Sequence, residues 1–114
     1  MEQRKFERFS ISGNVTFSGD SVRGEGRIDN LSLGGAAITS DVSVAKGDYL
    51  QLTMLLATEP RARAIEVELA PVRWIKDHSF GVEFIRVNPS ALQILQHFVE
   101  HLGPVPHHTA SPSL

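Results

Sequence analysis

The chain has 114 residues, which fits a single domain because typical domains contain roughly 100–150 residues. Its 11 Lys and Arg residues against 13 Asp and Glu residues argue against a protein that coats nucleic acid through bulk positive charge. The absence of cysteine excludes a disulfide framework, a thiolate metal site and a cysteine nucleophile, and it favours a cytoplasmic protein.

The chain ends differ in composition from its middle. Residues 1–8 are rich in charge and lack the apolar core of a signal peptide, and no later apolar run approaches the roughly 20 residues that span a bilayer. Residues 103–114 are rich in Pro, Ser and His without periodicity. We therefore predict a flexible segment over 1–8, a folded domain over 9–102, a disordered tail over 103–114, and no membrane insertion.

The first predicted unit is a β-hairpin. Residues 9–17 alternate between apolar and polar types, Ser18-Gly19-Asp20 has the composition of a turn, and residues 22–28 alternate again. If the chain turns at Gly19, the numbers of antiparallel partners add to about 38. This register predicts that Arg8 lies opposite Asn30.

Further strands follow in chain order. A short run covers residues 36–39, a strand with one apolar face covers 49–56, and a third begins at Ile65. Its alternation changes phase at Ala70-Pro71, which predicts a β-bulge that leaves Val72 and Trp74 facing inward. The last predicted strand covers residues 80–85.

One amphipathic helix is predicted after the strands. Asn88 is a suitable N-cap, Pro89 suits the first helical position, and one apolar side extends to Leu102 before Gly103-Pro104 ends the helix. Short strands followed by one helix indicate a mainly β fold, a small antiparallel barrel or sandwich with the helix over one opening.

Two short motifs flank the predicted hairpin, Arg4-x-x-x-Arg8 and Asn30-x-Ser32-x-x-Gly35. Arginine binds phosphate oxygens bidentately and presents paired donors to guanine, and an amide reaches the Watson-Crick edge of guanine. A glycine permits close approach of the backbone or a positive φ. Together the motifs predict a guanine nucleotide site.

These motifs resemble the PilZ domain family, whose paired motifs are RxxxR and [D/N]xSxxG. Val72-Arg73-Trp74 and Gly81-Val82-Glu83-Phe84 are similar to its later strands, so the resemblance covers about residues 3–102. It implies a six-stranded antiparallel β-barrel with a C-terminal amphipathic α-helix. It also implies a cytoplasmic bacterial receptor for the second messenger cyclic di-GMP (c-di-GMP), bound at the rim of the barrel.

The resemblance also assigns roles to residues. It implies that Arg4 and Arg8 clamp phosphate and guanine, that Asn30 and Ser32 read the second guanine, and that Gly35 allows close contact. Asn30 is the amide variant of a position that is often Asp.

Lys5 and Trp74 are further candidate contacts. In the family, residues beside the first motif, here Gln3 and Lys5, decide whether one or two ligand molecules bind. In some members an aromatic residue at the position of Trp74 packs near a base. Arg27 and Arg73 are nearby candidates, although an outward arginine on a strand usually only meets solvent.

The functional hypothesis is a receptor or adaptor without catalytic activity, cofactor or metal. Its N-terminal segment closes over c-di-GMP and signals to a downstream protein partner. The alternative is a PilZ-like protein-interaction module that binds no nucleotide. A phosphodiester hydrolase is poorly supported, because no acid/base pair or metal cluster accompanies the arginines. His97 and His101 lie on the polar side of the predicted helix, which favours contact with solvent over a metal.

Overall fold

The computed structural model describes residues 9–56 and 63–102, and the side chains of residues 13–56 and 63–100. The elements, in chain order, are β1 (Phe9–Ser18), β2 (Arg23–Ser32), β3 (Gly35–Thr39), β4 (Tyr49–Leu56), β5 (Arg63–Lys76), β6 (Ser79–Glu83), β7 (Arg86–Val87) and α1 (Pro89–Leu102).

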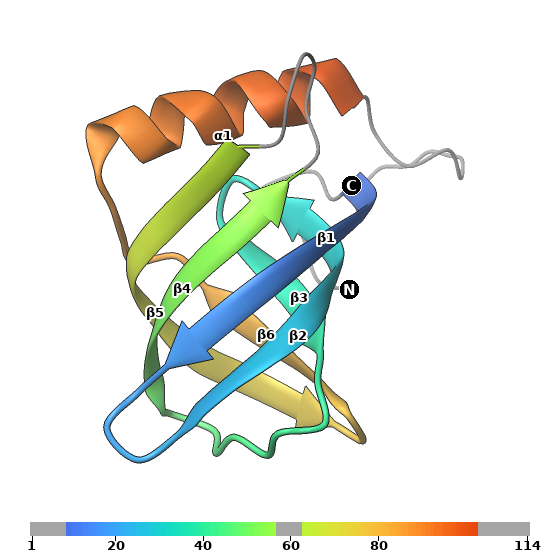
Figure 1. Cartoon of the computed structure of the whole chain (residues 1–114), viewed down its shortest axis with the longest axis vertical. Helices are drawn as coiled ribbons and strands as arrows, with labels where there is room; N and C mark the ends of the chain where they lie inside the picture. Colours follow the sequence, from blue (N-terminus) through green and yellow to red (C-terminus); the bar gives the residue numbers. More distant parts are fainter. Residues whose placement is uncertain (1–8, 57–62, 103–114) are drawn as a thin grey trace, which may run out of the picture.

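Six strands close into an antiparallel β-barrel (Figure 1). Neighbouring strands pair in the order β4-β1-β2-β3-β6-β5, and β5 pairs back onto β4. This confirms the predicted six-stranded barrel with a C-terminal helix. The two-residue strand β7 pairs with β5 as an addition that the sequence patterns did not predict.

The barrel interior follows the predicted alternation most closely in β4. All four even positions of β4 are buried, namely Leu50, Leu52, Met54 and Leu56, while the odd positions are exposed. Side chains on successive strand residues point to opposite faces, so this strand contributes one complete face to the core. Val15 and Phe17 of β1 join the same core.

The helix α1 lies across one end of the barrel, and the β1–β2 turn lies at the opposite end (Figure 1). The buried face of α1 includes Leu95, Phe98 and Val99. The Asn88 Oδ1 atom accepts a hydrogen bond from the backbone N–H of Ala91 at 2.8 Å, which confirms Asn88 as the N-cap. His97 is exposed, as predicted.

The first hairpin forms, but its register differs from the predicted one. The turn covers residues 19–22 and is closed by a 2.7 Å hydrogen bond from Gly19 N–H to the carbonyl of Val22. Val22 belongs to this turn, where it packs on the core, and β2 begins at Arg23. The turn is therefore longer than predicted, and the partners of the β2 residues are shifted along β1. The residue opposite Asn30 is Ser10 and not Arg8.

The strand β5 contains two irregularities. Leu52 pairs with Val67 and Leu50 pairs with Ala70, so the phase change occurs at residues 68–69, just before the predicted position. A second shift separates Val72 from Trp74. The prediction that Trp74 faces inward is wrong, because this second bulge turns the side chain outward, where it is 40% exposed.

The last predicted strand is shorter than expected. β6 ends at Glu83, and Ile85 instead donates its backbone N–H to the carbonyl of Leu69 at 2.9 Å. Within the described residues, no helix is long and apolar enough to cross a membrane. The predicted flexible segment 1–8 and the predicted tail 103–114 lie outside those residues.

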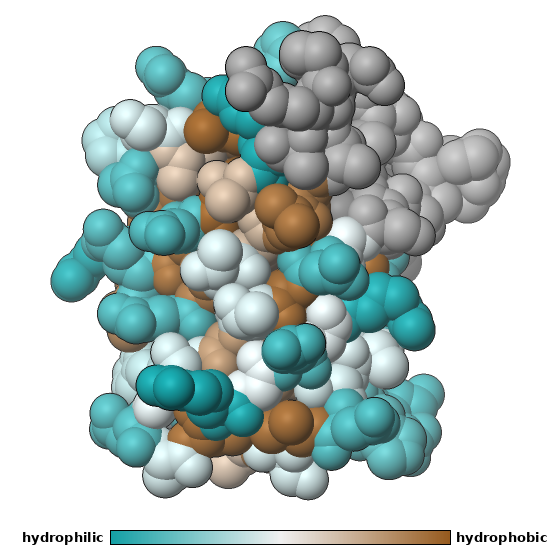
Figure 2. All heavy atoms as spheres, in the orientation of Figure 1, coloured by the Kyte–Doolittle hydropathy of each residue, from teal (hydrophilic) through white to brown (hydrophobic). Residues whose placement is uncertain are grey.

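The surface mixes polar and apolar residues. Figure 2 shows hydrophobic side chains in small areas between hydrophilic ones on the face viewed in Figure 1. The described large hydrophobic residues that are exposed come from several elements: Tyr49, Leu55, Trp74, Ile75 and Ile85. Scattered exposure of this kind is normal for a folded domain, so it does not by itself indicate an interface.

Replacing Asn88 tests the contribution of the cap. We expect Asn88→Ala to lower the free energy of unfolding by about 1 kcal/mol, because the Ala91 N–H loses its acceptor. Asn88→Asp keeps an acceptor oxygen and serves as the control, with a change below about 0.5 kcal/mol. Urea denaturation measures both, and equal losses in the two variants would contradict the assignment.

Candidate functional site

The two sequence motifs are described to different extents. Arg4, Lys5 and Arg8 of the first motif lie outside the described residues. The residue after Arg8, Phe9, opens β1 and pairs with Leu31, which lies between Asn30 and Ser32. The described part of the chain therefore brings the start of β1 to the second motif.

A row of four residues crosses the outside of the barrel from β2 to β5. Asn30 pairs with Ala37, Ala37 with Gly81, and Gly81 with Trp74. The adjacent row, Leu31, Ala36, Val82 and Val72, is buried in the core. Because side chains alternate between faces, the first row points outward. We call Asn30, Ala37, Gly81 and Trp74 the outer row.

A β-bulge in β2 directs Asn30 to the outside. Ile28 pairs with Ile38 while Asn30 pairs with Ala37, so Asp29 is the extra residue. The Asp29 carboxylate accepts hydrogen bonds from Arg27 Nε at 3.3 Å and from the Thr39 hydroxyl. Both partners belong to outward positions, so the bulge places a carboxylate and an amide next to each other on the outer face.

The Trp74 indole lies against Gly81. A Cβ atom built on Gly81 would meet the indole Nε1 at 2.0 Å, so the ring occupies the space that any side chain at position 81 would need. Ala37, the next residue in the row, also has a small side chain and is only 5% exposed. The indole and the Asn30 amide therefore border a floor made of Ala37 and Gly81.

The outer row has an aromatic ring at one end and an amide at the other. Three steps between neighbouring strands separate Asn30 from Trp74, which amounts to about 14 Å along the sheet. A flat aromatic surface at one end can stack on a base, and an amide at the other end can pair with a base edge.

Ser32 and Gly35 have roles within the hairpin that joins β2 to β3. The Ser32 hydroxyl accepts a hydrogen bond from the Gly34 N–H at 3.1 Å and donates one to the carbonyl of Gly35 at 3.4 Å. Ser32 is 4% exposed. The hydroxyl therefore stabilises the two-residue turn, and its predicted contact with guanine stays a prediction.

Gly35 approaches a neighbouring strand. A Cβ atom on Gly35 would lie 2.3 Å from the carbonyl oxygen of Val82 in β6. Among the described residues, positive φ occurs at Asp77 and Gly47 and not at Gly35, so of the two alternatives a positive φ is not the reason for a glycine here. The structure thus supplies a packing reason for this glycine, while its predicted ligand contact is untested.

Sequence reasoning missed three parts of this face. Ala37 and Gly81 were not identified as part of a site, because small residues in a strand do not show on which face of the sheet they lie. Asp29 was overlooked beside Asn30, since the bulge that turns both residues outward leaves no mark in the pattern. An antiparallel pairing of β5 with β6 around the turn at Asp77-His78 places Gly81 opposite Trp74, and this pairing is the signal that could have revealed the contact.

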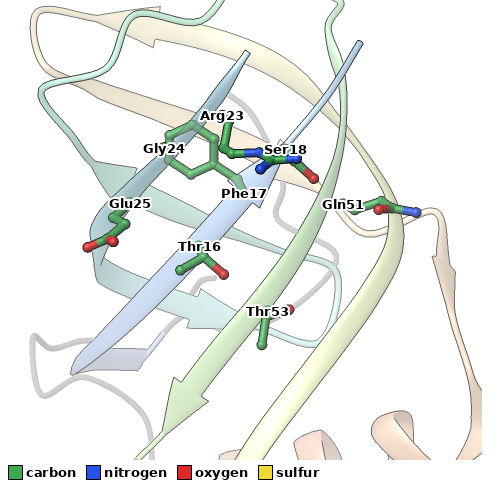
Figure 3. A pocket seen from close by; sticks show the side chains of 8 residues that line it. All are labelled: Thr16, Phe17, Ser18, Arg23, Gly24, Glu25, Gln51 and Thr53. Atoms are coloured by element: carbon green, nitrogen blue, oxygen red, sulfur yellow. The ribbon is translucent and has the colours of Figure 1, made fainter. Parts of the chain in front are cut away.

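A surface depression lies elsewhere on the barrel (Figure 3). Its lining residues are Thr16, Phe17, Ser18, Arg23, Gly24, Glu25, Gln51 and Thr53. They come from the ends of β1 and β2 nearest the first turn and from β4, whereas Asn30 lies toward the other end of β2. In Figure 3, Glu25 and Thr53 flank Thr16 on neighbouring strands. The depression is separate from the outer row.

The described residues contain no group of three or more His, Cys, Asp or Glu side chains that could hold a metal ion. Among the same residues, the ion pairs are Arg27 with Asp29 and Arg73 with Glu83. All four side chains of these pairs border the outer row, so the paired charges of this part of the chain concentrate there.

Comparisons with known proteins give the following matches. A family model described as the PilZ domain matches residues 2–101. No curated protein matches the sequence significantly. The inhibitor of motility MotI/DgrA of Bacillus subtilis is 23% identical with a TM-score of 0.71, and the match covers 89% of this chain and 52% of that one.

Two structures from Escherichia coli are also similar. YcgR in complex with c-di-GMP is 17% identical with a TM-score of 0.70, and 90% of this chain and 46% of that chain are covered. The PilZ domain of YcgR with c-di-GMP is 16% identical with a TM-score of 0.60, and the coverages are 89% and 92%. The chain spans about half the length of the first two structures. At these identities the likeness establishes the fold.

Gly35, which faces Val82 of β6, and Gly81, which faces Trp74 of β5, should respond differently to replacement by alanine. Gly35→Ala should lower the free energy of unfolding by about 2–3 kcal/mol, because the new Cβ meets a backbone carbonyl that cannot move independently. Gly81→Ala should cost about 1 kcal/mol or less, because the Trp74 side chain can rotate away, and it should shift the tryptophan emission. Chemical denaturation followed by fluorescence measures both, and equal costs would contradict this difference.

Proposed function

The chain belongs to the PilZ domain family, and we propose that it is a c-di-GMP receptor whose ligand binds over the outer row and beside the Arg4-x-x-x-Arg8 motif. The family consists of ligand-binding receptors and not of enzymes. YcgR, which has the same fold, is described in complex with c-di-GMP. We also propose that ligand occupancy is passed to a downstream protein partner, and that the protein acts in the cytoplasm.

The observation that carries the proposal is the outer row. Trp74 and Asn30 both point outward and border a floor of two small residues. A guanine base stacked on the indole would bury apolar area, and base stacking on an aromatic side chain contributes about 1–3 kcal/mol. The Asn30 amide would accept hydrogen bonds from the edge of the other guanine base of the ligand.

The first motif supplies the charge that the outer row lacks. c-di-GMP carries two phosphate groups, and bidentate arginine contacts are among the strongest contacts to phosphate. Arg8 is covalently joined to Phe9, whose pairing with Leu31 supports a position next to the second motif. In this proposal Arg4 and Arg8 contact phosphate and guanine, and Asn30 and Ser32 read the second guanine. Gly35 allows close contact with the ligand, and Lys5 influences the number of ligand molecules that bind.

Binding measurements on variants test the proposed site. We expect the wild-type protein to bind c-di-GMP, and Arg8→Ala or Asn30→Ala to weaken binding by about 1–3 kcal/mol, a five-fold to hundred-fold loss. Asn14→Ala, which removes an exposed amide from β1, is the matched control and should bind normally. Isothermal titration calorimetry gives affinity and stoichiometry, and the emission of Trp74, the single tryptophan, gives an independent signal.

If the wild-type protein does not bind c-di-GMP at micromolar concentration, this proposal is rejected. That result would favour instead a PilZ-like protein-interaction module that binds no nucleotide. Normal binding by both Arg8→Ala and Asn30→Ala would retain the ligand but place its site away from the two motifs.

We further propose that ligand binding orders the N-terminal segment, which would present a new surface to the partner. Ordering has an entropic cost, so the greater affinity of c-di-GMP for the closed arrangement must exceed it. Arg4, Lys5 and Arg8 are themselves sites for trypsin, which makes the change measurable.

Limited proteolysis tests this ordering. With ligand 100-fold above its dissociation constant, trypsin cleavage after Arg4 and Arg8 should slow by up to about a hundred-fold, because mainly the unbound protein is cut. Cleavage after Arg61, which belongs to neither motif, is the internal control and should change little. Mass spectrometry identifies the products, and unchanged cleavage at both arginines with bound ligand would reject the ordering step.

A further inference from the structure

The Arg73 guanidinium lies at the border of the outer row. Its Nε atom donates a hydrogen bond to Glu83 Oε1 at 2.8 Å. Glu83 pairs with Gly35 of the second motif, and Trp74 is the residue that follows Arg73. The ion pair therefore lies between the motif glycine on one side and the indole on the other.

A β-bulge explains why Arg73 and Trp74 share one face. Val72 pairs with Val82 and is buried, while Trp74 pairs with Gly81 and is exposed. One residue of β5, Arg73, is thus added between two successive pairs. In a regular strand Arg73 and Trp74 would point to opposite faces. The bulge places a guanidinium beside an indole on the outside of the barrel.

The ion pair orients the guanidinium without using all of its donors. Arginine has five N–H donors in a planar fork, and the Nε–H is the one that binds Glu83. The four N–H groups of the two Nη atoms have no described partner. The Arg73 and Glu83 side chains are 55% and 49% exposed, and ion pairs at such exposure contribute little stability. The contact fixes the direction of the fork more than it stabilises the fold.

The fork suits a phosphate group. Two Nη donors match two phosphate oxygens in a bidentate contact, and a lysine at this position could not hold Glu83 and present the same fork. A base stacked on Trp74 would bring the sugar-phosphate part of its nucleotide to the edges of the outer row. Arg73 lies at one of these edges.

We propose that Arg73, oriented by Glu83, is a phosphate-contacting residue of the ligand site, in addition to the arginines of the sequence motif. This inference rests on the proposed function, because it assigns a contact to c-di-GMP. It also adds a reason for the arrangement at β5, where the bulge and the ion pair together prepare a cationic group next to the stacking surface.

Calorimetric titration of the full chain with c-di-GMP at several NaCl concentrations tests the assignment. Arg73→Ala and Arg73→Gln should each lower the affinity about ten-fold, and Gln retains much of the aliphatic stem. Their affinity should also depend less on salt than that of the wild-type protein, because one charge contact to phosphate is lost. Arg23→Ala removes the same charge at the first turn, away from the outer row, and should bind within about two-fold of wild type.

The outcomes separate this inference from the proposed function. If the wild-type protein binds and both Arg73 variants bind equally well with the same salt dependence, the inference is overturned and the proposed function stands. If Arg23→Ala loses as much affinity as Arg73→Ala, the effect is one of net charge and the specific contact is rejected. If the wild-type protein does not bind at all, the proposed function fails and this inference fails with it.

Discussion

The register of the closed barrel is the constraint on which the candidate site depends. Every strand of the barrel is paired on both sides, so none can slip by one residue without moving its apolar face out of the core. Within this fixed register, only bulges can change the face on which a residue lies. Bulges at Asp29 in β2 and Arg73 in β5 turn polar and aromatic side chains toward the outside. The outer row exists because the strands between these bulges, β3 and β6, stay regular.

Small residues allow the same region to be tightly packed and accessible. Gly35 leaves room for the Val82 carbonyl, and Gly81 leaves room for the Trp74 indole. A larger side chain at either position would push a strand or a ring away from the barrel wall. Between Asn30 and Trp74 the outer row therefore holds only the small residues Ala37 and Gly81. Packing requirements and the shape of the site thus have a common cause.

The sequence predicted the elements better than their register. Alternation located β4 to the residue, and the capping pattern located the helix from Asn88. These features depend on local chemistry, which a sequence displays directly. The orientation of Trp74 was predicted wrongly, because a second bulge three residues after Ala70 depends on pairing with β6. The partner of Asn30 was also displaced, since Val22 belongs to the turn and not to the strand.

The hairpin itself accounts for part of the second motif. The Ser32 hydroxyl holds the turn and Gly35 fits beneath a carbonyl, so both residues would be needed in a barrel that bound nothing. Their presence alone is weak support for a ligand. The Arg73–Glu83 ion pair differs, because a pair at this exposure contributes little stability to the fold. The receptor proposal therefore gains more support from the oriented Arg73 guanidinium than from Ser32 or Gly35.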